Sequence, residues 1–202
     1  MIKFACFSPH PPLLLPNVGS EEDREKVKKT IESLKKLGKS FKEVNPDSII
    51  ISSPHPDWGF NVPFYFLAKD FKGETKTYLT GLESPEVHFA KGKSLSNNLE
   101  KDKNYALIAS GDLSHCLKEE GPYGFHPQGP KFDKDLIELL KKREIENFLK
   151  LDETYPEAGE CGLRSFSFVL GILEQAKINW QPEILSYEAP FGVGYLVANF
   201  KL

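Results

Sequence analysis

Residues 48–56 of the chain read SIIISSPHP, an apolar run that leads directly into a histidine between two prolines. A short apolar run bounded by polar residues is typical of a strand that is buried on both faces of a sheet. The same tetrapeptide, Ser-Pro-His-Pro, occurs at residues 8–11, after the apolar segment IKFACFS of residues 2–8. The sequence therefore predicts two buried strands, each followed by a stiff turn that carries a histidine.

The segment between these two strands predicts an amphipathic helix over residues 20–44. Ser20 is a suitable N-cap, and acidic residues follow it in the first turn. Apolar side chains recur at helical spacing, at Val27, Ile31, Leu34, Leu37 and Phe41. The chain is therefore expected to open with a β-α-β unit.

Strands and helices are mixed along the rest of the chain. We expect further strands at about residues 63–68, 76–80 and 104–110, and helices at about 91–101, 132–143, 144–151 and 159–176. The segments at 182–190 and 192–200 predict a closing β-hairpin. Together these elements predict the α/β class, as a single three-layer α/β/α domain with a central mixed β-sheet over residues 1–202.

Composition excludes several kinds of partner. The 202 residues carry a net charge of −3, and their lysines and glutamates are interleaved, which is not typical of a nucleic-acid binder. No apolar run approaches the ~20 residues of a membrane helix, and the N-terminal apolar stretch is too short for a secretory signal. We therefore expect a cytoplasmic protein. The three cysteines, Cys6, Cys116 and Cys161, do not indicate a disulfide framework.

His10 and His55 are the first candidates for a functional site. Both lie in a Ser-Pro-His-Pro tetrapeptide directly after a predicted strand. In an α/β sheet, ligands bind in the crevice beyond the carboxyl ends of the strands. The flanking prolines restrict the backbone and so hold each imidazole in place, which suits a metal ligand. The repeat therefore predicts a pair of histidine ligands at one edge of the sheet.

A third strand delivers Asp112 and His115, in the segment SGDLSH of residues 110–115. The flanks of His115 are small and polar, and an imidazole with an unperturbed pKa near 6.5 suits proton exchange. Asp112 is a candidate for orienting an imidazole, or it is simply a turn residue. The loop over residues 111–130 is long enough to be functional, and within it His126 is a weaker candidate for a residue that borders the substrate.

Two histidines do not hold a divalent metal alone, so an anionic ligand is expected from the segment EAGECGLRSF, residues 157–166. Glu160 would complete the arrangement of two histidines and one carboxylate that is typical of non-haem iron. The simpler interpretation is that Glu160 only favours the N-terminus of the following helix. Cys161 as the third ligand would make a softer site that favours zinc or copper. The residues leave this choice open.

Four motifs in order resemble one known family. They are FSPHPPLLLPNVG, ISSPHP, SGDLSH with YGFHPQGPKFD, and EAGECGLRSFSFVLG, and they extend over nearly the whole chain. The sequence is similar to the LigB-type class III extradiol ring-cleavage dioxygenases. It is closest to the branch found in the AmmeMemoRadiSam system and in Memo-like proteins.

The resemblance implies a non-haem Fe²⁺ enzyme that uses O₂ to cleave a catecholic ring next to its two hydroxyls, in the catabolism of aromatic compounds. It implies that His10, His55 and Glu160 bind the iron and that His115 is the acid/base. Memo-like relatives have a cysteine at the position of Cys161, so Glu160 and Cys161 remain competing ligands. Zn²⁺ is the alternative metal.

A second function is also kept open by the resemblance. The chain could be a metal-binding accessory protein that works with a radical-SAM partner and cleaves no ring. A homo-oligomer is a further expectation, and a zinc hydrolase with His115 as base is a third alternative.

Overall fold

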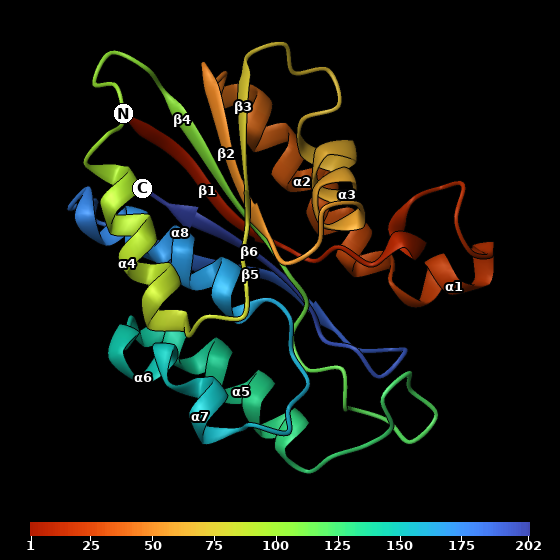
Figure 1. Ribbon diagram of the computed structural model, residues 1–202. Coiled ribbons are helices and arrows are strands. Elements are labelled where there is room, and N and C mark those ends of the chain that lie inside the picture. Colours follow the sequence, from red (N-terminus) through yellow and green to blue (C-terminus); the bar gives the residue numbers. More distant parts are fainter.

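A computed structural model describes residues 1–202, in which six strands form one mixed sheet in the order β3-β2-β4-β1-β6-β5 (Figure 1). The strands are β1 (Ile2–Ser8), β2 (Ser48–Ser53), β3 (Glu74–Leu79), β4 (Tyr105–Ser110), β5 (Gln181–Glu188) and β6 (Tyr195–Lys201). The helices are α1 (Glu21–Lys26), α2 (Lys28–Val44), α3 (Trp58–Leu67), α4 (Pro85–Ser96), α5 (Gln128–Lys142), α6 (Ile145–Leu149), α7 (Leu151–Thr154) and α8 (Leu163–Gln175), with a short 3-10 turn at Pro12–Leu14.

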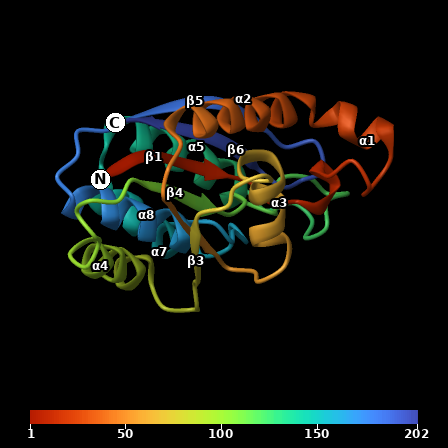
Figure 2. The same cartoon turned by 90° about the horizontal axis from the view of Figure 1, so that it is seen from above.

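Helices cover both faces of this sheet. Helices α2 and α3 lie on one side, and α4 and α8 lie on the other (Figures 1 and 2). Consecutive residues of β1 face opposite ways, so that Phe4 and Cys6 enter the core beneath α2 and α3, whereas Ala5 and Phe7 enter the core beneath α8. The predicted three-layer α/β/α fold with a mixed sheet is confirmed.

The register of the parallel strands aligns their carboxyl ends. Strands β3, β2, β4 and β1 pair with one another in parallel, and β6 pairs antiparallel with both β1 and β5. At the ends, Ser8 of β1 lies opposite Ser110 of β4, and Ser52 of β2 lies opposite Ala109. The loops that follow β1, β2 and β4 therefore leave the sheet side by side. The predicted C-terminal hairpin is also confirmed, as β5 and β6.

The long amphipathic helix predicted over residues 20–44 is divided into α1 and α2 at Val27, whose φ of −115° departs from helical geometry. Ser20 is its N-cap, as predicted, and forms a capping box with Asp23. The longest helix, α2, has 17 residues with charged side chains along it, and none of the helices could cross a bilayer.

The prediction of a strand at residues 63–68 is wrong, because residues 63–67 belong to α3 and Ala68 is its C-cap. Its run of aromatic residues has strand propensity, which favoured the wrong interpretation. The buried positions Phe60, Pro63 and Leu67 are spaced by three and four, which is the period of a helix with one face against a core. Tertiary packing on α2 therefore overrides local propensity. The helix expected at 91–101 also begins earlier, at Pro85.

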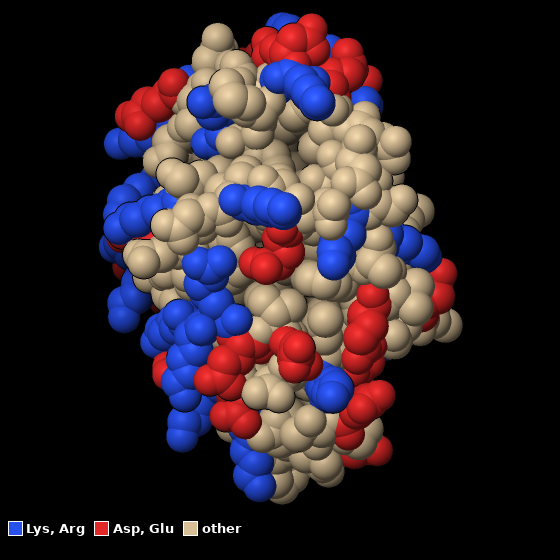
Figure 3. Space-filling view, turned by 90° about the vertical axis from the view of Figure 1, so that its left-hand side faces the viewer, with Lys and Arg blue, Asp and Glu red and all other residues tan.

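Charged side chains of both signs are spread over the surface on which α4 lies. Figure 3 shows lysine and arginine side chains gathered along one side of this face, with acidic side chains beside and below them. Several lysines pair with acids, as Lys91 does with Glu83 at 2.6 Å and Lys103 with Glu100 at 2.8 Å.

The packing of α8 on β1 predicts a large loss of stability when Phe166 is truncated. Phe166 of α8 is fully buried and stacks on Phe7 of β1, with ring centroids 4.2 Å apart. We expect Phe166→Ala to lower the free energy of unfolding by about 3–5 kcal/mol, measured by urea denaturation. Trp58→Ala, which removes a side chain that is 46% exposed, should cost less than about 1 kcal/mol. Equal losses for both variants would contradict this packing.

Candidate metal centre

His10 and His55 follow β1 and β2 by two residues, and the strand β4 lies between these strands in the sheet. Their imidazole rings nevertheless meet above the tip of β4, with ring centroids 5.2 Å apart and ring planes at 77°. His10 is buried, whereas His55 is exposed. The repeated Ser-Pro-His-Pro turns thus bring two imidazoles together at the predicted edge of the sheet.

Hydrogen bonds fix the orientation of His10. Its backbone N–H donates to Asp112 Oδ1 at 3.1 Å, and its Nδ1 lies 2.9 Å from Ser110 Oγ at the tip of β4. Nδ1 is therefore occupied, and Nε2 is the nitrogen that remains for a ligand. Burial, together with the nearby charge of His55, lowers the pKa of His10 to about 3. The imidazole is therefore neutral at neutral pH, which is the form that binds metals.

Cys161 completes a group with these two histidines. It lies on the loop before α8, and its Sγ is 3.6 Å from His10 Nε2. The potential ligand atoms of His10, His55 and Cys161 all lie within 4.8 Å of one another. The backbone N–H of Asp112 also donates to Sγ, at 3.3 Å. Burial raises the pKa of this thiol well above its usual value, so binding of a metal would release its proton.

A close backbone contact allows Cys161 to reach the strand tips. Gly111 follows β4, and a Cβ placed on it would come within 2.2 Å of the Cα of Gly162. The Gly162 N–H donates to the Asp112 carbonyl at 2.9 Å. Any side chain at Gly111 would therefore push the loop of Cys161 away from the histidines.

Asp112 and His115 form a second group with Cys161, again with ligand atoms within 4.8 Å. Burial raises the pKa of the Asp112 carboxyl to about 6, although the His10 N–H and the charges of His115 and His55 oppose the rise. At His115, burial has the opposite effect and lowers the pKa of the imidazole, while the charge of Asp112 acts to raise it. The Nε2 atom of His115 is buried without a hydrogen-bond partner. A buried, unpaired nitrogen of this kind is available to a bound substrate or ion.

The backbone around His115 is held on both sides. The His115 N–H donates to the Gly159 carbonyl at 3.1 Å, and the Ser114 N–H donates to the Asp133 carboxylate at 2.8 Å. Above the imidazole lies Tyr123, 67% exposed, whose ring centroid is 5.1 Å from that of His115. The long loop thus places an exposed aromatic ring over the buried imidazole.

Glu160 and His126 lie outside both groups. The Glu160 carboxylate accepts hydrogen bonds from the Leu163 N–H at 2.6 Å and from Arg164 Nη1 at 3.0 Å. It therefore occupies the N-terminus of α8, as the simpler interpretation of the sequence had it. His126 uses its Nδ1 to accept from the Gln128 N–H at 3.3 Å, and its contact with a substrate remains a prediction.

Sequence reasoning missed Ser110, Tyr123 and the pair Gly111–Gly162. A signal for Ser110 was present, because β1, β2 and β4 all end in serine: Ser8, Ser53 and Ser110. The Ser53 hydroxyl accepts from the His55 N–H at 3.1 Å, much as Ser110 contacts His10. The contact between the glycines joins segments about fifty positions apart and leaves no local pattern.

These residues fit a transition-metal ion. Two imidazoles and one thiol converge, the buried His10 is neutral, and the His115 nitrogen beside them lacks a partner. Imidazole and thiolate are ligands for zinc, copper and iron rather than for Mg²⁺ or Ca²⁺. The arrangement supports chemistry in which an ion binds a substrate and a neighbouring base moves a proton.

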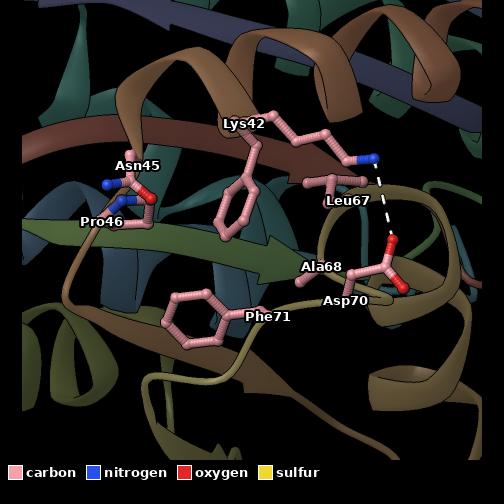
Figure 4. Close-up of a pocket in the computed structure, with 8 residues that line it drawn as sticks. Lys42, Asn45, Pro46, Leu67, Ala68, Asp70 and Phe71 are labelled. Atoms are coloured by element: carbon pink, nitrogen blue, oxygen red, sulfur yellow. Dashed lines mark ion pairs between the residues drawn. The ribbon is translucent and has the colours of Figure 1, made fainter.

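A separate pocket of about 260 Å³ lies near the amino end of β2, between the ends of α2 and α3 (Figure 4). Its lining is mostly apolar, with one ion pair between Lys42 and Asp70 at 3.9 Å. It contains no histidine or cysteine, and β2 separates Pro46, in its wall, from His55. This pocket is therefore separate from the candidate metal centre at the carboxyl edge of the sheet.

Residues 53–198 match the family described as the catalytic LigB subunit of aromatic ring-opening dioxygenase. The chain belongs to this family. The match contains His55, His115 and Cys161, whereas His10 precedes it. The LigB resemblance of the sequence motifs is thereby confirmed.

Two known proteins are similar to this LigB-family chain. Protein CA_C1420 of Clostridium acetobutylicum is 30% identical over 96% of this chain and 56% of its own length, so the chain spans about half of that relative. The crystal structure of the uncharacterized protein JW3007 from Escherichia coli K12 is 15% identical, with a TM-score of 0.62 over 97% of this chain and 98% of that one. At that identity, the likeness shows the shared fold.

The contact between Ser110 and His10 predicts a role in metal binding. Ser110→Ala removes the hydroxyl beside Nδ1, which frees the ring to rotate, and should weaken Zn²⁺ binding about tenfold, measured by calorimetry. Ser8→Ala is the matched control, because the Ser8 hydroxyl at the tip of β1 donates its hydrogen bond to the Pro9 carbonyl and makes none to a histidine. Unchanged binding in Ser110→Ala would show that this contact does not orient His10.

Asp133 predicts a pH dependence of stability. It is buried, accepts hydrogen bonds from Tyr187 Oη and the Ser114 N–H, and has a pKa raised by burial to about 7. The pKa of Asp133 is higher in the folded protein than in the unfolded chain. The stability that the protonated Asp133 contributes is therefore complete below pH ~3.8 and is lost as the pH rises through ~7.

Asp133→Asn keeps one acceptor oxygen, for the Ser114 N–H, and cannot ionise. Its free energy of unfolding should therefore rise relative to wild type between pH 4 and 7, by at most about 1.4 kcal/mol per pH unit, in urea titrations at each pH. A constant difference across this range would contradict the raised pKa.

Proposed function

We propose that this LigB-family protein is a non-haem Fe²⁺-dependent extradiol dioxygenase that opens a catecholic ring with O₂. The observation that supports the proposal is the meeting of His10, His55 and Cys161 at one sheet edge, beside the unpartnered Nε2 of His115. The family description supplies the reaction class, an aromatic ring opening. The substrate class, the metal and the activity of this chain are parts of the proposal.

His10 and His55 would hold the ion through imidazole nitrogens, and Cys161 would hold it through its thiolate. A bound Fe²⁺ would supply a Lewis acid for the catecholic oxygens and a redox partner for O₂. The chain's contribution at His10 is a neutral ring whose Nδ1 is held by Ser110. Zn²⁺ is the alternative ion for the same three groups.

His115 is the proposed acid/base. Burial lowers its pKa, so its imidazole is neutral at neutral pH and can accept a proton from a substrate hydroxyl at Nε2. The nearby Asp112 carboxylate favours the resulting imidazolium. Tyr123 covers the imidazole and offers an aromatic surface to the substrate ring. His126, on the same loop, is the proposed further contact with the substrate.

One observation favours a second function, in which the protein is a metal-binding accessory of a radical-SAM-linked system and cleaves no ring. Cys161, rather than Glu160, lies against His10 and His55. Two imidazoles with a thiolate favour zinc or copper more than two imidazoles with a carboxylate do. In this alternative, the partner or a second copy of the chain would meet the exposed side of the centre, where His55 lies.

Metal content and oxygen uptake test the proposal together. Protein purified without oxygen should contain about one iron per chain, as expected for a site with one set of ligands. It should consume O₂ with catechol or protocatechuate. His10→Ala should lose the metal, whereas His115→Ala should keep it and lose about 100-fold or more of the oxygen uptake.

Two outcomes would contradict these assignments. If His115→Ala lost metal as completely as His10→Ala, His115 would be a ligand and not the acid/base. If the purified protein held zinc or copper and reconstitution with Fe²⁺ gave no oxygen uptake, the accessory function would replace the dioxygenase.

A further inference from the structure

Arg164, in the first turn of α8, joins three separate segments of the chain. Its Nε donates to the Glu83 carbonyl at 2.8 Å, its Nη1 to Glu160 Oε1 at 3.0 Å, and its Nη2 to Asp152 Oδ2 at 3.3 Å. Glu83 precedes α4, and Asp152 lies in α7. One guanidinium therefore ties the residue next to Cys161 to two other parts of the molecule.

The Glu160 side chain is fully engaged by these contacts. Its second oxygen accepts from the Leu163 N–H at 2.6 Å, and the side chain is only 7% exposed. On the other side of the same loop, the N–H groups of Cys161 and Gly162 donate to the Asp112 carbonyl, at 3.4 and 2.9 Å. Cys161 is thus held between two sets of hydrogen bonds.

Stability alone does not explain a buried carboxylate at this place. The cost of removing the two charges from water largely offsets their attraction, so the ion pair itself contributes little net stability. The N–H groups of a guanidinium, however, point in fixed directions, so its three acceptors can lie only in one arrangement. The ion pair therefore selects one conformation of the loop.

We propose that Arg164 and Glu160 are positioning residues for the metal centre. Their contacts hold the loop so that Cys161 Sγ faces His10 Nε2, at 3.6 Å. Glu160 thereby acts on the ion through its neighbour and not as a ligand. The inference depends on the proposed metal centre at Cys161 but not on any particular reaction.

Titration of the metal-free 202-residue chain with Co²⁺ tests this role, because a cobalt–thiolate bond gives a charge-transfer band in the near ultraviolet. Arg164→Lys keeps the positive charge but cannot reach three acceptors at once. It should bind Co²⁺ about 10- to 100-fold more weakly, with a weaker charge-transfer band. Glu160→Gln keeps an oxygen for the Leu163 N–H and should show a smaller loss of the same kind.

Two controls isolate the effect. Lys141→Ala removes a different ion pair, which joins Lys141 to Glu138 at 3.0 Å on the surface of α5. This variant should bind Co²⁺ like wild type. Cys161→Ser should lose the charge-transfer band. Circular dichroism identifies any unfolded variant. If Arg164→Lys does not fold, Asp152→Asn, which weakens a single contact of Arg164, should still lower the Co²⁺ affinity about tenfold.

The failures are distinguishable. If folded Arg164→Lys binds Co²⁺ with the affinity and band of wild type while Cys161→Ser loses the band, the positioning role is wrong and the metal centre stands. If Cys161→Ser keeps the affinity and the band of wild type, the centre at Cys161 is wrong, and the positioning role is wrong with it.

Discussion

The candidate centre depends on the common register of three parallel strands. Strands β2, β4 and β1 are neighbours in the sheet, and their last residues lie opposite one another. Neighbouring strands lie about 4.8 Å apart, so the loops that leave their ends start within the reach of side chains. Strands β1, β2 and β4 are buried on both faces, so a slip of register by one residue would turn every side chain into the core on the opposite side of the sheet, where it would not fit. The convergence of His10 and His55 follows from this arrangement.

Burial then sets the protonation states at the centre. It keeps the His10 and His115 imidazoles neutral, raises the pKa of Asp112 to about 6, and raises the pKa of the Cys161 thiol. All these shifts disfavour charge in the absence of an ion. A cation that enters would reverse the effect at Cys161, because it stabilises the thiolate. The same burial that disfavours a free thiolate would therefore strengthen the attraction between that thiolate and a bound cation.

The identity of the third ligand separates the two proposed functions. Membership of the LigB family brings the expectation of a ring opening, for which two histidines and a carboxylate would be the usual iron ligands. In this chain Glu160 pairs with Arg164 and caps α8, while its neighbour Cys161 faces the histidines. If Cys161 rather than its neighbour Glu160 is the third ligand, the site offers a thiolate in place of a carboxylate. The metals that the site favours change accordingly.

Much of this could be read from the sequence, because it depends on local patterns. The apolar runs of the buried strands, the capping serine Ser20, the closing hairpin and the paired Ser-Pro-His-Pro turns each leave a signal within about ten residues. The placement of His10, His55, Asp112 and His115 at one edge followed from those signals and from the rule for the carboxyl ends of parallel strands. The family resemblance came from the same motifs.

Only the tertiary structure decided the remaining points. Segment 63–68 has the composition of a strand, but packing on α2 makes residues 63–67 part of α3. Adjacent residues in a loop point in different directions, so the sequence could not choose between Glu160 and Cys161. That choice depends on His10 and Asp112, which are 151 and 49 positions away from Cys161 along the chain, and on the Arg164 contacts. Contacts at such separations have no period or spacing in the sequence, because the folded sheet alone brings them together.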